Sequence, residues 1–99
     1  MTTNTASQED FASRETALEA APPGHVIFEV MSHKGDTKYL WNKENPDEVS
    51  EAKEAFKRFK GRGYMAYKVS DKGDKTGEVL HEFDPTAERI IFSPPHKGG

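Results

Sequence analysis

The sequence has 99 residues and a net charge of -3, is 33% hydrophobic and 31% charged, and contains no cysteine. A chain of this length fits one domain and buries about 60–65% of the surface that its unfolded form exposes, which disfavours a deep enclosed active site. The missing cysteines exclude disulfides, thiolate zinc sites and cysteine nucleophiles. The sequence has no apolar run near the roughly 20 residues that a membrane span needs, so we expect a cytoplasmic protein with no membrane partner.

The negative charge is concentrated at the N-terminus. Residues 1–22 carry four acidic side chains and one arginine, whereas the rest of the chain carries 13 acidic and 13 basic side chains. Nucleic-acid-binding domains usually have a basic excess, because phosphate neutralisation dominates their affinity. The balanced charge therefore argues against a nucleic-acid partner.

The first 23 residues predict a tail. The opening "MTTNTASQ" is rich in Thr, Asn and Ser, a composition that does not offset the entropy lost on ordering. Phe11 and Leu18 lie a heptad apart, but two apolar anchors do not hold an isolated helix of this length in water. We expect a disordered or weakly helical tail over residues 1–23, a domain over residues 24–93 and a flexible tail over residues 94–99.

A strand hairpin is predicted at the start of the domain. "HVIFEVM", residues 25–31, places Val26, Phe28 and Val30 on one face by its alternation. The turn signal "HKGD" separates it from a second strand, "TKYLW", at residues 37–41. These two segments predict an antiparallel pair.

The clearest element is the helix in "NPDEVSEAKEAFKRFKGRG". Asn45 is suited to the cap and Pro46 to the first helical position, and Glu48 would complete a capping box. Gly61 and Gly63 would end the helix. Its apolar positions recur at helical spacing and form one stripe that must face a sheet, with Phe56 as a core anchor. The stripe consists of Val49, Ala52, Phe56 and Phe59.

Basic side chains gather late in this helix. Lys57, Arg58, Lys60 and Arg62 are open to two interpretations, a patch that binds anions or simple complementarity to the helix dipole. The dipole explains them with fewer assumptions, given the neutral charge of the domain.

Three more strands are predicted after the helix, at "YMAYKV" (64–69), "VLHEF" (79–83) and "ERIIFS" (88–93). The order is strand–strand–helix–strand–strand, with a further strand if the last pieces are separate. This order predicts an α+β fold in which one helix packs on one face of a mixed sheet and the other face meets solvent.

Enzyme signatures are missing from the sequence. The four histidines never fall at a metal-ligand spacing, and the sequence has no HExxH, GxSxG, phosphate loop or dinucleotide fingerprint. In "HEFD", His81 and Phe83 would share one strand face while Glu82 and Asp84 would share the other, so an acid and a base do not converge. We expect no enzyme activity, no cofactor and no metal.

Four aromatic side chains are open to two interpretations. Tyr39, Trp41, Tyr64 and Tyr67 could form an interaction surface, including a stacking platform for single-stranded nucleic acid. Alternatively, they could pack in the core or at its rim. We favour this second interpretation because the sequence has no basic groove beside them.

The element order and the ending "SPPHKGG" together resemble the ubiquitin-like β-grasp proteins. The resemblance covers residues 25–99 in element order, with Gly98 and Gly99 as the matching motif. It implies a β-grasp-like mixed sheet, no catalytic residue, and a Gly99 carboxylate that is activated with ATP and joined to an amine or a sulfur carrier. The partners would be an adenylating enzyme and target proteins, and the exposed sheet face would be the recognition surface. Glycine would let the tail thread a narrow active site, and Pro94 and Pro95 would act as an extended spacer.

The sequence departs from the family at both ends. "SPPHK" replaces the Arg- or Leu-containing approach to the diglycine, and the polar N-terminal extension lies outside the minimal fold. The ending "FDP…RII…PP…GG" also resembles that of small bacterial or phage-encoded proteins. Two alternatives stay open, a non-catalytic protein–protein interaction module, such as a bacterial or phage accessory or virion-associated protein, and binding of single-stranded nucleic acid.

Overall fold

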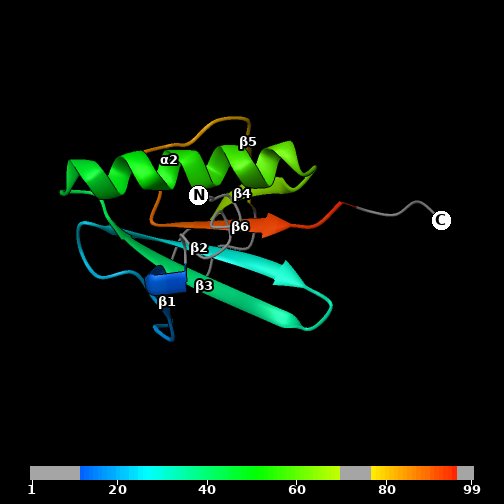
Figure 1. Ribbon diagram of the computed structural model, residues 1–99, viewed down its shortest axis with the longest axis horizontal. Coiled ribbons are helices and arrows are strands. Elements are labelled where there is room, and N and C mark those ends of the chain that lie inside the picture. The colour runs from blue at the N-terminus through cyan, green and yellow to red at the C-terminus, as the bar shows by residue number, and fades with distance from the viewer. Residues whose placement is uncertain (1–11, 70–76, 96–99) are drawn as a thin grey trace, which may run out of the picture.

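The computed structural model describes residues 12–69 and 77–95, which form an α+β fold of one long helix on a six-stranded mixed sheet (Figure 1). The expectations for residues 1–11 and 96–99 lie outside the described residues. Along the chain, the elements are a 3-10 turn η1 (Ala12–Arg14) and the elements β1 (Glu15–Thr16), β2 (His25–Ser32), β3 (Gly35–Asn42), α2 (Pro46–Gly61), β4 (Met65–Val69), β5 (Glu78–Leu80) and β6 (Arg89–Ser93).

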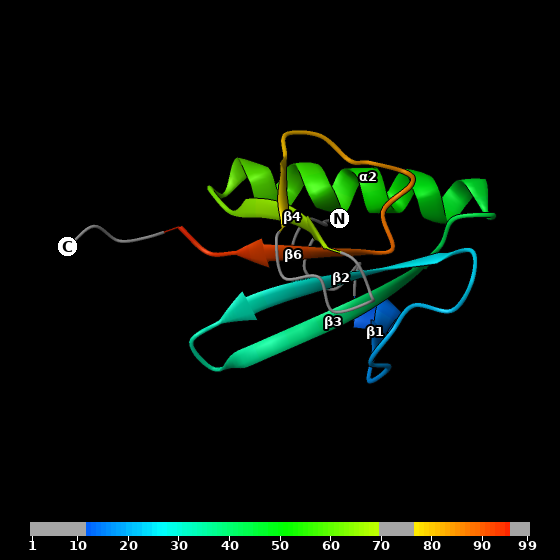
Figure 2. The ribbon, with the colours of Figure 1, turned by 180° about the vertical axis from the view of Figure 1, so that it is seen from behind.

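The last strand lies in the middle of the sheet. The strand order is β1-β3-β2-β6-β4-β5, and β6 lies between β2 and β4 (Figure 1, Figure 2). β6 pairs in parallel with β2, with Ile27 opposite Arg89 and Val30 opposite Phe92, and antiparallel with β4. All other neighbouring strands are antiparallel. A strand that is covered on both faces favours a continuous apolar run, and in "IIF" at residues 90–92 Ile90 and Phe92 are buried in the core while Ile91 is half-buried on the opposite face.

The start of α2 joins the helix to the preceding strand. The Asn45 side chain accepts a hydrogen bond from the Asp47 amide at 3.0 Å, as a capping residue should. The predicted capping box is wrong, because the Glu48 carboxylate accepts from the backbone N–H of Asn42 at 2.8 Å. Glu48 thus ties the first helical turn to the end of β3.

A Schellman motif ends α2 where the sequence predicts the stop. The Tyr64 amide donates to the Phe59 carbonyl at 3.0 Å, and the Gly63 amide donates to the Lys60 carbonyl at 2.9 Å. Gly63 has a φ of 93°, a conformation that favours glycine. The rings of Phe59 and Tyr64 lie 5.4 Å apart and supply the apolar contact that usually accompanies this motif.

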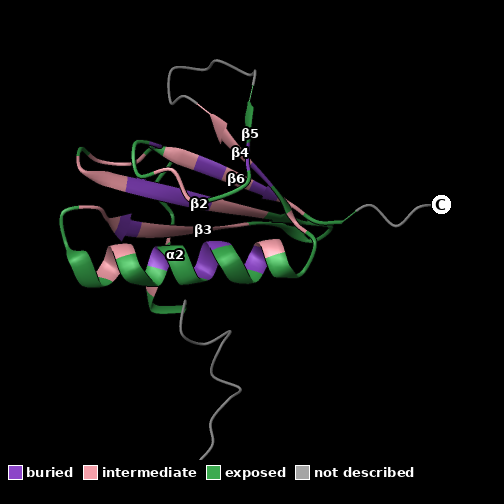
Figure 3. Ribbon diagram, turned by 90° about the horizontal axis from the view of Figure 1, so that it is seen from above, coloured by how far each residue is buried: buried purple, intermediate pink, exposed green. Residues whose placement is uncertain are grey.

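The core lies between α2 and the sheet face that it covers (Figure 3). Phe92 of β6 is fully buried, and its ring centroid is 5.0 Å from that of Phe59, 5.1 Å from that of Phe28 and 5.5 Å from that of Phe56. The predicted helix stripe is confirmed at three positions, and Ala55 adds a fourth buried residue to it. The other buried members of this cluster are Val26, Trp41, Ala52, Ala66, Leu80, Ala87 and Ile90.

The opposite sheet face is partly covered by the segment before β2. Arg89 pairs there with the Glu29 carboxylate and also donates to the backbone carbonyl of Glu19. Ile27, on the same face, has no exposed surface. This end of the face is therefore closed.

Residues 12–16 extend the sheet beyond β3. They fall within the tail predicted over residues 1–23, whereas in the structure β1 pairs Glu15 with Tyr39 of β3. The Arg14 guanidinium lies 2.9 Å from the Glu51 carboxylate and 5.7 Å from the centre of the Trp41 ring. These contacts fasten the segment across β3 and α2.

One predicted strand is shorter than expected. β5 ends at Leu80, so the prediction of a strand over residues 79–83 is wrong at its last three residues. The chain leaves β4 there and crosses to the helix side, where Phe83 packs against Phe28 at 6.0 Å and Phe56 at 6.3 Å between ring centroids. Burial of the Phe83 ring thus prevails over further strand pairing.

We expect Phe56→Ala to lower the free energy of unfolding by about 3–5 kcal/mol, because the ring is 2% exposed and packs against Phe83 and Phe92. Chemical denaturation followed by circular dichroism would measure the loss. Ser50→Ala, at an exposed position of the same helix, is the control and should change stability by less than about 0.5 kcal/mol. An unchanged midpoint for Phe56→Ala would contradict this account of the core.

Candidate functional site

The four aromatic residues singled out from the sequence do not form one surface. Trp41 is 1% exposed and belongs to the core. Tyr39 and Tyr64 are partly buried against the same core, and burial raises the pKa of the Tyr39 hydroxyl, with a smaller contribution from the Glu15 carboxylate. Tyr67 lies on the opposite sheet face, paired with Ile91. The alternation of each strand separates these side chains, and the ring of Trp41 is not accessible to a partner.

The spacer prolines follow β6 directly. Pro94 and Pro95 are exposed, while the diglycine Gly98–Gly99 lies outside the described residues. Pro95 passes beside the turn between α2 and β4, where a Cβ added at Gly63 would lie 3.4 Å from the Pro95 Cβ. This is an ordinary van der Waals distance, so the positive φ of Gly63 at the helix end, and not the approach of Pro95, is what favours glycine there.

Apolar side chains surround the end of β6 on the sheet face away from α2. We call this group the exit surface. Met31 is 40% exposed, Met65 is 41% exposed and Val79 is 42% exposed. Met65 pairs with Ser93, the last residue of β6, and the parallel register of β2 brings Met31 level with it from the other side. The exit surface consists of Met31, Met65, Tyr67, Val79 and Ile91.

Of the exit surface, only Tyr67 is among the site residues predicted from the sequence. The alternation in "HVIFEVM" already places Met31 opposite to Val30, and so away from the helix. What the alternation cannot supply is the parallel β2–β6 register, which brings Met31 and Met65 to the same end of the sheet.

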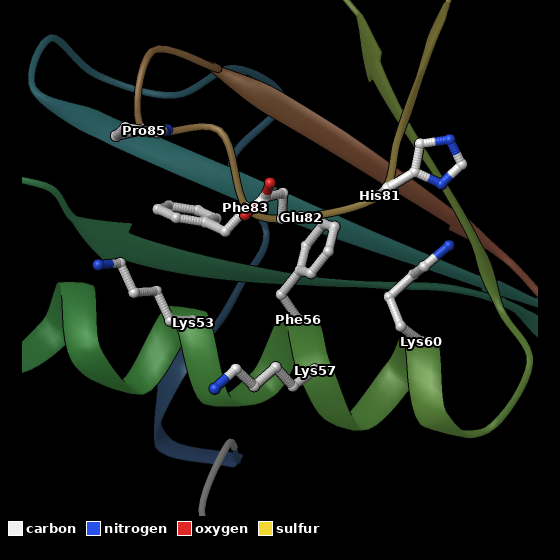
Figure 4. A pocket seen from close by; sticks show the side chains of 8 residues that line it. All are labelled: Lys53, Phe56, Lys57, Lys60, His81, Glu82, Phe83 and Pro85. Carbon is white, nitrogen blue, oxygen red and sulfur yellow. The ribbon is translucent and has the colours of Figure 1, made fainter.

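A groove of about 460 Å³ lies between α2 and the segment after β5. Figure 4 shows lysines along the helix and the segment opposite them, with the rings of Phe56 and Phe83 between the two walls. We call it the lysine groove. It is lined by Lys53, Phe56, Lys57, Lys60, His81, Glu82, Phe83 and Pro85.

The segment wall of the lysine groove is fixed by Asp84. One carboxylate oxygen lies 2.8 Å from the Lys68 ammonium, and the other accepts from the Thr86 amide at 2.9 Å and from the Thr86 hydroxyl at 2.7 Å. The bonds from Lys68 and Thr86 lower the pKa of Asp84 to about 2. Lys43 adds a hydrogen bond to the Ala87 carbonyl at 3.0 Å. The wall is thus held in place without any ligand.

Neither a metal centre nor a membrane-spanning helix is found in the part of the chain that the structure describes. Across residues 12–69 and 77–95, His, Asp and Glu side chains never gather in a group of three that could hold a metal ion. The helices within the same ranges all fall short of the length and apolarity that crossing a membrane requires.

No family model matches this chain, and searches of curated proteins and of solved structures find no similar protein. The features of the chain that bear on function are therefore the topology of the sheet, the exit surface and the lysine groove.

We expect Asp84→Asn to destabilise the protein at neutral pH and to have less effect in acid. The pKa of Asp84 is about 2 in the folded protein, below the ordinary 3.8, so its ion pair stabilises the fold above about pH 4 and is lost as the pH falls towards 2. The melting temperature of the variant should be a few degrees lower at pH 7, and the gap should close between pH 4 and pH 2.

Thermal melts at several pH values would measure this gap. Glu82→Gln, an exposed carboxylate in the same segment with no ion pair among the described residues, is the matched control and should leave the pH dependence unchanged. A gap for Asp84→Asn that stays constant from pH 7 to pH 2 would contradict the stabilising role of the Asp84–Lys68 pair.

Proposed function

We propose that this chain has the ubiquitin-like β-grasp fold and acts as a protein modifier or carrier through Gly98 and Gly99. Two antiparallel pairs, β2–β3 and β4–β5, lie on either side of β6, and β6 pairs in parallel with β2. The helix α2 lies across one face of this sheet. A helix held by a mixed sheet in this strand order is the arrangement that the term β-grasp denotes. The topology therefore supports the proposal.

The position of β6 carries the functional part of the proposal. β6 is locked between β2 and β4 up to Ser93, and the chain then continues through two exposed prolines. Proline lacks an N–H and fixes φ, so Pro94 and Pro95 do not prolong the sheet pairing. The segment that leads to the diglycine thus starts from a strand that is paired on both edges.

The chemistry would take place at the Gly99 carboxylate. A carboxylate oxygen attacks the α-phosphate of ATP and releases pyrophosphate, which leaves an acyl adenylate. An amine or a sulfur nucleophile then attacks the carbonyl carbon and releases AMP. The adenylating enzyme, in the cytoplasm, supplies the catalytic groups. This chain supplies a carboxylate without a neighbouring Cβ, which a narrow active site can admit.

The exit surface would supply recognition. An enzyme that holds the carboxylate must also hold the domain, and the exposed methionines lie beside the strand that leads to the diglycine. Flexible, polarisable methionine side chains suit a surface that contacts more than one partner. The exit surface therefore fits successive contacts with an adenylating enzyme and with proteins that act on the adducts.

We expect deletion of Gly99 to abolish covalent adducts of this chain in its native host. A chain with an N-terminal affinity tag would be purified under denaturing conditions and analysed by blotting and intact-mass spectrometry. The unaltered chain should give adducts whose mass equals the sum of the two partners less one water. The deletion variant should give the free protein only.

A Lys97→Ala variant controls for a general effect of altering the C-terminal segment and should still form adducts. Free protein alone in both samples would overturn the modifier function. Association that persists without adducts and survives deletion of the diglycine would instead assign a non-catalytic interaction module.

We expect the double substitution Met31→Glu with Met65→Glu to reduce adduct yield about tenfold or more, because it places two charges in the apolar contact. Both side chains are exposed, so the fold should be retained. Leu18→Glu, at a residue with a similar exposure of 44%, is the control and should leave the yield unchanged. An equal loss in the control, or none in the double variant, would contradict recognition through the exit surface.

A further inference from the structure

We propose that the lysine groove binds an acidic peptide segment of a partner protein, in which carboxylates flank an apolar side chain. The proposal does not depend on the diglycine, because the groove lies on the helix side of the molecule whereas the exit surface lies on the opposite sheet face. The lysines of α2 would supply the positive charge for such a peptide.

Three lysines line one flank of the helix. Lys53, Lys57 and Lys60 are spaced four and three residues apart, which places them on the same side of α2 over about 10 Å of its length. Figure 4 shows Lys60 reaching across the groove towards the side on which His81 lies. The result is a row of cationic groups along a single wall.

The helix dipole does not account for this row. Its effect falls off within the last turn, and the basic residues of the last turn are Arg58 and Lys60. Lys53 and Lys57 lie further from the C-terminus of the helix. The dipole therefore explains Lys60 but not Lys53 and Lys57, the other two lysines that line the groove.

The three ammonium groups have no carboxylate partner among the described residues. The described ion pairs join Arg14, Lys68 and Arg89 to acidic residues elsewhere. Glu82 is the single acidic side chain in the groove lining. In a chain with a net charge of -3, this local excess of cations is complementary to an acidic ligand.

The floor of the groove is aromatic. Phe56 is 2% exposed, and Phe83 packs edge-on against it with 6.3 Å between ring centroids. Pro85 adds a further apolar lining residue. A volume of about 460 Å³ accommodates an apolar side chain and the backbone on either side of it. Carboxylates on the neighbouring residues of such a peptide would then meet the lysines at the rim.

The walls are already in place before any ligand binds. Asp84 fixes the segment through Lys68 and Thr86, and Ala87 is buried in the core. A preformed groove loses less conformational freedom on binding, which favours affinity. A peptide is preferred over a nucleic acid because nucleic-acid binding requires a basic excess that this chain lacks, whereas a peptide can place an apolar side chain on the aromatic floor and its carboxylates at the three lysines.

The test uses the purified full chain and a fluorescein-labelled peptide of sequence GEEDFEDLEG, followed by fluorescence anisotropy at low and at moderate salt. We expect saturable binding that weakens with salt. Lys57→Glu should weaken it about tenfold, because it replaces an attraction with a repulsion. Lys34→Glu, which makes the same charge change at an exposed residue of the β2–β3 turn, is the matched control and should leave affinity within about twofold.

Two further probes isolate the groove. A peptide in which alanine replaces the Phe and Leu should bind at least about fivefold more weakly, because the aromatic floor loses its contact. Deletion of Gly98 and Gly99 should leave peptide binding unchanged, so failure of the modifier function and failure of this inference give different results. Both lysine variants should retain the circular dichroism spectrum of the unaltered chain.

Several results would overturn the inference. One is the absence of peptide binding at low salt, and another is an equal loss of affinity in Lys57→Glu and Lys34→Glu. Tighter binding of a single-stranded oligonucleotide of matched charge would assign the groove to nucleic acid. Binding that disappears with the diglycine would place the peptide on the C-terminal segment instead.

Discussion

The packing of Phe92 is the contact on which the rest of the structure depends. Its ring joins the aromatic residues of β2 and α2, and it belongs to the strand that pairs with both halves of the sheet. β6 is also the last strand in the sequence, and its partner β2 lies some 60 residues earlier in the chain. Long-range parallel pairing of this kind is intrinsically slow to form, because the entropy of loop closure is lost before the contacts are made. The sheet and its core are therefore complete only when the segment up to Ser93 is in place.

The two faces of the sheet are closed by different means. On the helix side, burial of aromatic and aliphatic side chains excludes water. On the other side, Arg89 holds Glu29 and the carbonyl of Glu19, so charged contacts close one end of the face. The neighbouring Asp36 carboxyl and, next to it, burial raise the pKa of Glu29. The opposite end has no such covering contact among the described residues, and the exposed methionines lie there beside the exit of the C-terminal segment.

Local patterns in the sequence predict most of the helix and the first hairpin, because caps, turn glycines and alternation act over a few residues. The Gly63 stop and the buried face of α2 follow from such patterns. The strand β1 does not, since two residues cannot show a period, and its place depends on Arg14 reaching α2. β5 ends early because the Phe83 ring packs against Phe56, a contact between residues that lie far apart in the sequence. Trp41 shows why the candidate site is harder to predict than the helix. Alternation assigns Trp41 to one face of the sheet, but whether that face is buried depends on where α2 packs.

The positions of the two candidate surfaces make them compatible with each other. The lysine groove is built on the outer flank of α2 and the exit surface on the far side of the sheet, with the whole core between them. A peptide in the groove would leave the methionines uncovered, since no groove-lining residue belongs to the exit surface. The groove wall is fixed by Asp84 and Lys68, and Lys68 belongs to β4, the strand that also carries Met65 and Tyr67 towards the opposite face. One strand thus positions both surfaces, so the two proposed contacts would not compete for the same residues.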